Sequence, residues 1–431
     1  MKVLFVYPRF SRHAEHHPEL RTYVPMEEYL GSPSLGIASV AAVTPDDWEI
    51  EYRDDRLEPA DAPTDADVVA MSFFTPAASR AMELADRFRA MGKKTVAGGI
   101  FPTMMPDVVA AHFDAVVVGE GDEVWPEVLA DVARGALKPR YRAAPCDLER
   151  LPPPRVDVYF GAERPGRFEP DDYPLQVSRG CALSCNACAL PGTMGNRMRA
   201  FPEAHVLAQM ERLAAAGKRA CLTEDTGWFG GTSGNKRMLA LFDALIADPG
   251  RFRISYVGVS MPQILAATPN TLTKARAAGV TMFYLVGGFD PVTMRAFTGE
   301  DPAALARAHR AIARCHEFGI EPYTSFLVGN EADDEGTVDR MLEFADKSGI
   351  RKSEFAIFTP YPGTPSWHKL VSEDRILTKD WSRYNDANVV FRPARMSADA
   401  LQDSYLRLWR EFYAGKSHLA DLPRYERTIQ F

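Results

Sequence analysis

Three cysteines with a spacing suited to metal chemistry lie near the middle of the chain, at Cys181, Cys185 and Cys188. The pattern C-x3-C-x2-C lets three thiolates of one short loop bind three irons of a cubane iron–sulfur cluster. The fourth iron then stays open to a small ligand. The sequence therefore predicts a [4Fe-4S] cluster with one reactive corner.

Two other uses of these thiols fit the sequence less well. An odd, closely spaced set cannot pair internally as disulfides, and the remaining cysteines are scattered along the chain at positions 146, 221 and 315. A closed zinc site needs a fourth ligand at a suitable spacing, and the next histidine, His205, follows only after a long gap.

Length and composition are those of a globular protein with several domains. The chain has 431 residues, of which 25% are charged and 46% hydrophobic. At about 150 residues per domain this length corresponds to about three domains. Apolar runs fall short of the roughly 20 residues that a membrane span needs. The N-terminus reads as a strand rather than a signal peptide, so we expect a cytoplasmic protein without a membrane span.

Charge and cysteine usage agree with that compartment. Free thiols persist where the environment is reducing. The formal net charge of -8 argues against a polyanionic partner, so we do not expect binding to nucleic acid.

Residues 1–145 alternate strand and helix patterns, which is typical of an α/β domain with a doubly wound, Rossmann-like parallel sheet. The predicted strands are 2–7, 48–53, 68–73, 94–97 and 115–118, and the longest predicted helices are 77–91 and 123–134. Two strand exits carry glycine, at Gly98-Gly99 and at Gly119-Glu120-Gly121-Asp122. Ligands of open parallel sheets lie beyond such exits. No G-x-G-x-x-G follows the first strand, which argues against a dinucleotide.

The rest of the chain divides into three further parts. Residues 146–172 are rich in proline and are predicted to be a linker. Residues 173–375 contain six strand-and-helix units, enough for a partial (βα)6 barrel of the TIM type, with the cysteine loop after its first strand. The predicted strands of this barrel are 175–178, 220–223, 254–257, 282–286, 323–328 and 354–358. Residues 376–431 have a helical, aromatic pattern and form the predicted C-terminal extension.

With these features the sequence resembles the radical S-adenosylmethionine (SAM) superfamily and, more narrowly, its class with an N-terminal cobalamin-binding domain. The cysteine triad has the spacing and the position of that superfamily's cluster motif. Residues 98–103 and 117–122 are similar to the glycine pair and the G-E-G-E-like turn of those cobalamin domains. Residues 361–365, Tyr-Pro-Gly-Thr-Pro, look like the sixth-strand exit of the subclass that includes the anaerobic magnesium-porphyrin cyclase and hopanoid-modifying enzymes.

The resemblance implies three cofactors: a [4Fe-4S] cluster, S-adenosylmethionine and cobalamin. One electron from the cluster would cleave the sulfonium and release a 5′-deoxyadenosyl radical. An external one-electron donor of the flavodoxin or ferredoxin type is then a required partner, together with a small-molecule substrate.

The resemblance also suggests which residues contact SAM, from their positions at or after the barrel strands. They are Glu224, Asp225, Gly287, Gly288, Asp290, Ser325 and Gly329. Each could instead be a helix cap or a turn residue. The chain departs from the family at Ala187, where an aromatic residue usually precedes the third cysteine and packs against adenine.

For cobalamin, the resemblance suggests contacts from Ser72, Gly98, Gly99, Gly119 and Glu120. The corrinoid motif D-x-H-x-x-G does not occur in residues 1–145, so cobalamin is expected base-off without a histidine ligand. The loop after the first strand holds three histidines, at positions 13, 16 and 17. We interpret it as a solvated polar loop, with a metal site as the alternative.

Methyl transfer from methylcobalamin to an unactivated carbon or phosphorus of a natural product or lipid is the activity that the resemblance favours. Oxidation, cyclisation or ring contraction with the same cofactors is an alternative. A sensor that binds the cluster and corrinoid without turnover is another. Methylthiolation of transfer RNA is disfavoured because the N-terminal domain lacks the extra cysteines of such enzymes. In the C-terminal region Tyr405 and Trp409 could contact the substrate, although aromatic residues at helical spacing are commonly core.

Overall fold

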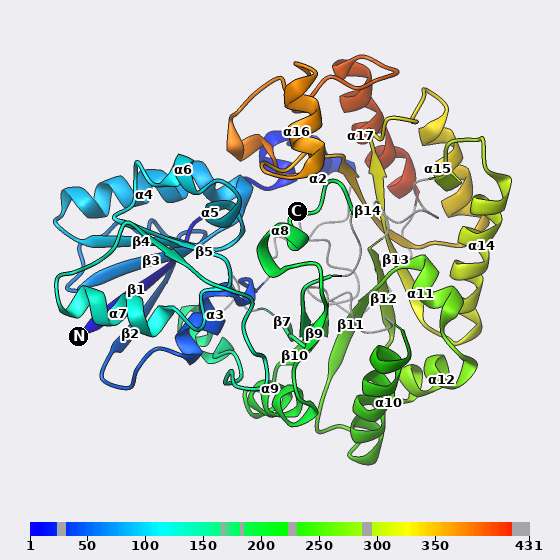
Figure 1. Ribbon diagram of the computed structural model, residues 1–431. Helices are drawn as coiled ribbons and strands as arrows, with labels where there is room; N and C mark the ends of the chain where they lie inside the picture. The colour runs from blue at the N-terminus through cyan, green and yellow to red at the C-terminus, as the bar shows by residue number, and fades with distance from the viewer. Residues whose placement is uncertain are drawn as a thin grey trace.

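The computed structural model consists of two parallel β-sheets that lie side by side, each covered by helices (Figure 1). It describes residues 1–23, 32–164, 168, 170, 172–181, 185–222, 231–286 and 295–415. The predicted α/β fold class is confirmed, including the Rossmann-like first sheet, the partial barrel and the helical C-terminal extension.

The N-terminal sheet has six parallel strands in the order β2-β1-β3-β4-β5-β6. They are β2 (Glu49–Asp54), β1 (Lys2–Tyr7), β3 (Val68–Ser72), β4 (Lys94–Gly98), β5 (Ala115–Val118) and β6 (Arg140–Arg142). The first five have the flavodoxin-like order, in which the chain changes direction between β1 and β3. Ligands of such sheets bind beyond the carboxyl ends of the strands at this switch point.

Helices cover both faces of this sheet (Figure 1). They are α3 (Leu35–Ala42), α4 (Ala78–Ala90), α5 (Ile100–Met104), α6 (Pro106–Val109) and α7 (Trp125–Ala133), with the 3-10 turn η1 (Thr75–Ala77) before α4. The strands β1 and β3 are buried almost throughout, which explains their continuous apolar sequence.

The second sheet also has six parallel strands, in the order β14-β13-β12-β11-β10-β7. They are β7 (Asp172–Pro174), β10 (Arg219–Leu222), β11 (Ile254–Val259), β12 (Met282–Val286), β13 (Glu321–Val328) and β14 (Lys352–Ile357). β7 and β14 are the two edges of this order, so the described strands form an open, partial barrel.

The barrel helices lie outside its sheet. They are α9 (Glu203–Ala215), α10 (Gly231–Ala247), α11 (Met261–Ala266), α12 (Pro269–Ala277), α14 (Pro302–Glu317), α15 (Thr337–Lys347) and α16 (Pro365–Ser372). Thr364 begins α16 by accepting a hydrogen bond from the backbone N–H of Trp367.

The start of the barrel differs from the prediction. We expected a strand over residues 175–178, but β7 ends at Pro174. The chain then forms a short antiparallel pair, β8 (Ser178–Arg179) with β9 (Arg199–Ala200), which closes the base of the cysteine loop. Pairing with the next loop, rather than with the sheet, thus fixes the residues immediately before Cys181.

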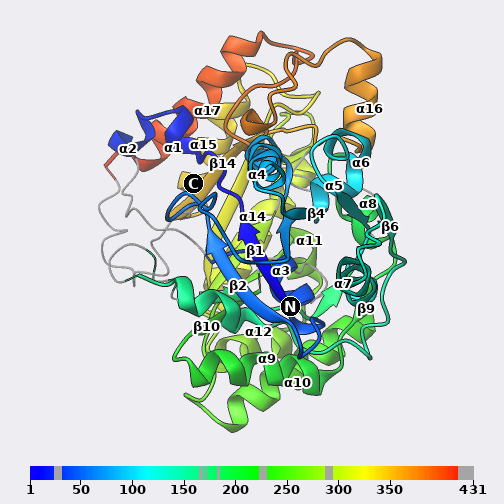
Figure 2. The same cartoon turned by 90° about the vertical axis from the view of Figure 1, so that its left-hand side faces the viewer.

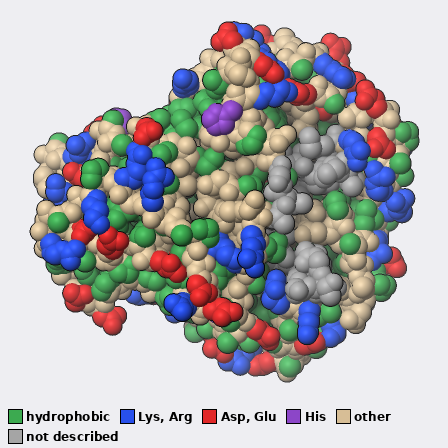
Figure 3. All heavy atoms as spheres, viewed as in Figure 1, with side chains coloured by type: hydrophobic (Ala, Val, Ile, Leu, Met, Phe, Trp, Pro, Cys, Tyr) green, Lys and Arg blue, Asp and Glu red, His purple; other side chains and the backbone are tan. Residues whose placement is uncertain are grey.

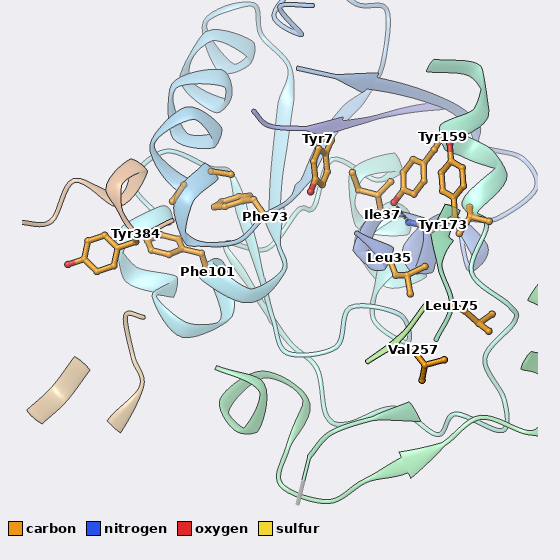
Figure 4. Close-up of a cluster of buried hydrophobic side chains, with 14 of the residues drawn as sticks. Tyr7, Leu35, Ile37, Phe73, Phe101, Tyr159, Tyr173, Leu175, Val257 and Tyr384 are labelled. Atoms are coloured by element: carbon orange, nitrogen blue, oxygen red, sulfur yellow. Dashed lines mark hydrogen bonds between the residues drawn. The ribbon is translucent and has the colours of Figure 1, made fainter. Parts of the chain in front are cut away.

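The predicted linker is packed against the first domain. Its 3-10 helix η2 (Val156–Ala162) contacts β2, and the fully buried Tyr159 donates a hydrogen bond to the Ser34 carbonyl (2.7 Å) and accepts one from the Ala38 N–H (3.0 Å). Tyr159 also stacks on Tyr173 of β7, with ring centroids 6.4 Å apart. Figure 4 shows this apolar cluster running from the first sheet into the barrel.

The segment after β1 packs against the C-terminal helix. It forms α1 (His13–His16) and α2 (Leu20–Tyr23), which lie beside α17 (Ala398–Tyr413) (Figure 2). His13 Nδ1 is 2.8 Å from the Tyr405 hydroxyl, and His17 Nε2 is 2.9 Å from the Ala387 carbonyl. The interpretation as a solvated loop is therefore wrong, because these rings hydrogen-bond to the C-terminal region.

No helix in the described ranges combines the length and the apolarity needed to cross a membrane.

We predict that His13 makes stability depend on pH. Burial, with smaller contributions from His17 and His16, lowers the pKa of His13 from 6.5 to about 4. The unfolded chain therefore binds more protons between these pH values, so stability is complete above about pH 6.5 and falls as the pH approaches 4. His13→Asn, which can keep the hydrogen bond to Tyr405, should remove about 2 kcal/mol of the loss between pH 7.5 and 5.

Urea unfolding followed by tryptophan fluorescence at both pH values measures this difference. His112→Asn is the control, because His112 lies on the surface beside Asp86. Equal losses in wild type and His13→Asn would contradict the assignment.

Candidate functional site

The cysteine loop is held at both ends by backbone contacts. The Cys181 N–H donates to the Gly195 carbonyl (3.2 Å), and the Cys188 N–H donates to the Cys185 carbonyl (3.2 Å). Gly180 has a φ of +79°, and a Cβ there would lie 2.3 Å from the Arg197 carbonyl oxygen. Only glycine fits at this close approach, so the turn into the loop depends on it.

The three thiols are chemically suited to a cluster. All three are free of disulfides and partly exposed, whereas the cysteines at 146, 221 and 315 are buried. Burial raises the pKa of Cys146 and of Cys315 to about 12, so both stay protonated near neutral pH. Burial also raises the pKa of Cys188, so it is their spacing and partial exposure that mark the three loop thiols as ligands.

The described side chains do not form a site for a single metal ion. In the described ranges, which omit residues 182–184 of the loop, no three His, Cys, Asp or Glu side chains gather closely enough to hold one ion. A cubane spreads its thiolates over separate irons, so its ligands need not meet at one point. The finding argues against closed zinc coordination by these residues and leaves the cluster assignment as a prediction.

The loops at the carboxyl ends of the first sheet face the cysteine loop. The helix after that loop, α8 (Leu190–Met194), packs against α5 of the N-terminal domain (Figure 1). Met104 of α5 inserts between two glycines of the barrel: a Cβ at Gly192 would lie 2.7 Å from its sulfur, and one at Gly363 would lie 3.0 Å from its Cε. Small residues on one side thus let the two domains approach closely.

The predicted cobalamin residues Ser72, Gly98 and Gly99 meet at the switch point. The Ser72 hydroxyl lies between two glycine backbones, since a Cβ at Gly36 or at Gly99 would come within 2.4 or 2.9 Å of it. Gly99 has a φ of +97°. By contrast, a Cβ at Gly98 would meet nothing within 4 Å. The end of β4 therefore borders open space, as a cradle for a bulky ligand requires.

Gly119 and Glu120 belong to the exit of β5, and the structure brings them to the barrel. Gly119 has a φ of +99°, and its N–H donates a hydrogen bond to Thr103 Oγ1 (3.1 Å). A Cβ there would lie 2.5 Å from the Ala143 carbonyl oxygen. Glu120 is buried, and its carboxylate accepts hydrogen bonds from Arg179, Arg199 and the Cys146 N–H. Its role as a cobalamin contact stays a prediction, and these partners give it a structural role of its own.

Arg179, two residues before Cys181, is the centre of a buried ion-pair network between the domains. Its two terminal nitrogens lie 2.7 and 3.0 Å from the Asp122 carboxylate, and one lies 3.2 Å from Glu120. Its remaining hydrogen bonds reach Ser39 Oγ (3.3 Å) and Gln176 Oε1 (3.0 Å). The side chains of Arg179, Glu120 and Asp122 are 4%, 3% and 8% exposed, so these charges depend on one another for solvation.

A second arginine extends the network on the other side of the loop. Arg199 of β9 pairs with Glu120 and donates to the carbonyls of Cys146 (2.7 Å) and Met194 (3.0 Å). Both strands at the base of the cysteine loop are therefore tied to the exit of β5. Sequence reasoning missed Arg179 and Asp122 as partners, although each stands directly in a motif that it recognised.

Polar side chains from three strands meet on the inner face of the barrel. On β14, Phe355 packs outward against Trp409, so its neighbour Glu354 points to the opposite, inner face. Glu354 accepts hydrogen bonds from the hydroxyls of Tyr284 on β12 and Tyr323 on β13, the latter at 3.0 Å. The SAM candidate Ser325 lies on this face, where its hydroxyl bonds with Tyr284.

A carboxylate and a phenol follow β14 at the mouth of the barrel. The Tyr361 hydroxyl donates to Asp386 Oδ1 (2.8 Å). Burial, with Glu354 adding to it, raises the pKa of Asp386 from 3.8 to about 6. Asp386 can therefore exchange a proton near neutral pH. The sequence marks Tyr361 as part of the sixth-strand exit but contains no local signal for Asp386 or Glu354.

The predicted contact at Gly329 has a different environment. Its N–H donates to the Asp333 carboxylate (2.8 Å), and a Cβ would lie 3.0 Å from Leu401 of α17. Gly329 thus packs against the C-terminal helix, and its contact with SAM stays a prediction. The other SAM candidates, Glu224, Asp225, Gly287, Gly288 and Asp290, lie outside the described residues.

The two substrate candidates are part of the core. Tyr405 and Trp409 are both fully buried, and Trp409 packs edge-on against Phe355. Neither side chain has exposed surface for a substrate in this structure. Both therefore pack as core residues, the alternative that their helical spacing also allowed. Ala187, where the family has an aromatic residue, is also buried.

Comparisons with known proteins agree with this arrangement. Residues 30–129 match the family model of the B12-binding domain. The chain is 27% identical over 401 residues to bacteriochlorophyllide d C-8(2)-methyltransferase of Chlorobaculum tepidum, covering 89% of this chain and 86% of that protein. It is 23% identical to hopanoid C-2 methylase of Rhodopseudomonas palustris, over 88% of this chain and 72% of the methylase.

Among solved structures, the fold is similar to that of the radical S-adenosylmethionine methyltransferase TsrM from Kitasatospora setae, determined with cobalamin and a [4Fe-4S] cluster bound. The TM-score is 0.64 at 18% identity, and the match covers 95% of this chain and 85% of TsrM. At this identity the likeness concerns the fold.

The domain match, the two sheets and the cysteine loop agree with one another. Residues 30–129 are a B12-binding domain, and over most of its length the chain is similar to enzymes named methyltransferases. The resemblance stated from the sequence is confirmed by these comparisons.

Proposed function

We propose that this protein is an enzyme that cleaves S-adenosylmethionine reductively and transfers a methyl group to an unactivated carbon or phosphorus of a small molecule. The observation that carries the proposal is the arrangement of the two domains. The carboxyl-terminal edge of a B12-binding domain lies against the segments that flank the loop of three cysteines, none of them in a disulfide, through Met104 and Arg179.

The residues present fit both groups that this chemistry needs. The open space at Gly98 and the close backbones at Gly36 and Gly99 would border cobalamin. Cys181, Cys185 and Cys188 would bind the cluster. When bound, the cluster supplies an electron to the sulfonium and the corrinoid supplies a methyl group, which amino-acid side chains cannot do.

The chain's own residues would orient and shield the reactants. Ser325, Tyr284 and Glu354 line the inner face of the barrel and can accept or donate hydrogen bonds to a cosubstrate there. Asp386, with Tyr361 beside it, can hold or release a proton at the barrel mouth. Glu224, Asp225, Gly287, Gly288 and Asp290 remain proposed SAM contacts from the sequence.

The proposal includes the setting in which the enzyme works. An external electron donor of the flavodoxin or ferredoxin type would reduce the cluster, and the protein would act in the cytoplasm, where thiols stay reduced. On the face shown in Figure 3, acidic and basic side chains are interspersed, which suits a small-molecule substrate better than a nucleic acid. The domain boundaries at residues 145, 172 and 375 are part of this proposal.

Cys185→Ala should abolish formation of 5′-deoxyadenosine from SAM and dithionite, because the two thiolates that remain are not enough to hold the cluster. Retention of cobalamin should change little, since the N-terminal domain has its own core. Product is measured by liquid chromatography with mass detection, next to iron and cobalt content. Cys315→Ala, at a buried cysteine outside the loop, serves as the control.

A Cys185→Ala protein that still yields 5′-deoxyadenosine would refute the cluster assignment. Wild type with an intact cluster that yields none would instead support a sensor. Transfer of labelled methyl from SAM to an acceptor separates methylation from cyclisation or ring contraction.

Gly98→Val should weaken cobalamin binding by about tenfold or more, because its side chain would fill the space at the end of β4. The fold should survive, as a Cβ there meets no protein atom within 4 Å. Gly161→Val is the matched control, since Gly161 is equally unobstructed but lies in η2. Equilibrium dialysis with cobalamin decides the matter, and equal affinity in both variants would exclude Gly98 from the site.

A further inference from the structure

The buried network around Arg179 joins two elements that, on the proposed function, carry different cofactors. Asp122 and Glu120 follow β5 at the ligand edge of the B12-binding domain, and Arg179 directly precedes Gly180 and Cys181. The guanidinium uses both terminal nitrogens on Asp122, at 2.7 and 3.0 Å. A bidentate pair of this kind fixes orientation as well as distance.

We propose that the Asp122–Arg179 pair is a positioning device that sets the cysteine loop in register with the corrinoid edge. It would therefore be required for methyl transfer between cofactors and dispensable for chemistry at the cluster alone. The proposal rests on the proposed function, because it assigns a corrinoid to one side of the interface and a cluster to the other.

Two observations and one physical argument support a positioning role over general stabilisation. The network continues through Arg199, so both strands at the base of the loop are tied to the same turn. Met104 provides a second contact nearby, where α5 meets α8. Hydrophobic residues could stabilise such an interface equally well, but they would not dictate direction as a planar guanidinium does.

The chain offers a matched control for Asp122. Asp131 is also a buried carboxylate of the N-terminal domain, with a side chain 4% exposed, and it pairs with Arg134 and the Tyr141 hydroxyl (2.8 Å). Its partners Arg134, Lys138 and Tyr141 all lie within its own domain. Asp122→Asn and Asp131→Asn therefore remove the same charge, and only the first acts on the interface.

The first measurement concerns the structure of the full-length protein without any turnover. Hydrogen exchange with mass detection reports opening of α5, α8 and residues 176–181. In Asp122→Asn, exchange at these segments should rise by at least about tenfold, because Arg179 loses its bidentate partner. In Asp131→Asn the rise should be confined to α7 and β6.

The second measurement separates two reactions of the holoenzyme loaded with cobalamin and cluster. The labelled methyl of SAM passes to cobalamin reduced by titanium(III) citrate. The electron pair of the reduced cobalt forms the new carbon–cobalt bond, and the broken carbon–sulfur bond leaves its pair on S-adenosylhomocysteine. Formation of 5′-deoxyadenosine with dithionite, in contrast, needs only the cluster and SAM.

Asp122→Asn should slow the methyl transfer by about a hundredfold, the effect of an error of about 1 Å in alignment. Formation of 5′-deoxyadenosine should stay within about twofold of wild type, and Asp131→Asn should change neither rate by more than that. A purely structural role would lower both rates together.

Arg179→Lys provides the second variant if Asp122→Asn does not fold. Lysine keeps the buried charges paired but lacks the planar fork, so the same split should appear at a smaller size. Methyl transfer that is unchanged in a folded variant, or both rates falling in parallel, would overturn the proposal. If wild type carries out neither reaction with both cofactors bound, the proposed function fails, whereas the exchange result still tests the interface.

Discussion

A buried arginine lies at the centre of the charged contact between the two domains of this protein. Arg179 is surrounded by two carboxylates, a serine hydroxyl and a glutamine amide, and these partners come from both domains. A buried guanidinium without a counter-charge would be strongly destabilising, because it loses its hydration. The carboxylates of the other domain compensate for this loss when the two domains are in contact. The cysteine loop starts two residues after this arginine.

The docking joins two sheets of the same kind at their functional edges. Parallel sheets present ligands at the carboxyl ends of their strands, and here the exits of β1, β3, β4 and β5 all lead to contacts with the second domain or its C-terminal helix. Phe101 after β4, for example, packs against Trp381, with ring centroids 5.4 Å apart.

Much of the fold could be predicted from local sequence. Strands such as 2–7, 115–118 and 282–286 have the predicted bounds, because a buried parallel strand is a short continuous apolar run between polar turns. The start of the barrel was predicted less well, since the segment 175–178 has a strand-like composition while its pairing depends on the distant β9. Local sequence does not reveal which distant strand a segment pairs with, or in which register.

In the candidate site, too, some features could be predicted from local sequence and others could not. The cysteine spacing and the glycine exits could be recognised because covalent geometry and backbone conformation restrict residue type at those positions. Glu354, Asp386 and the partners of Arg179 could not, since a charged residue in an apolar context does not reveal which distant group it meets.

The contact between His13 and Tyr405 spans 392 positions of the chain. During synthesis the ribosome must therefore complete the B12-binding domain, the cysteine loop and the barrel strands before α17 can cover α1 and α2. A contact between residues so far apart in the sequence forms slowly compared with local structure. In a nascent chain the residues of both sheets are therefore synthesised before α17 can cover α1 and α2.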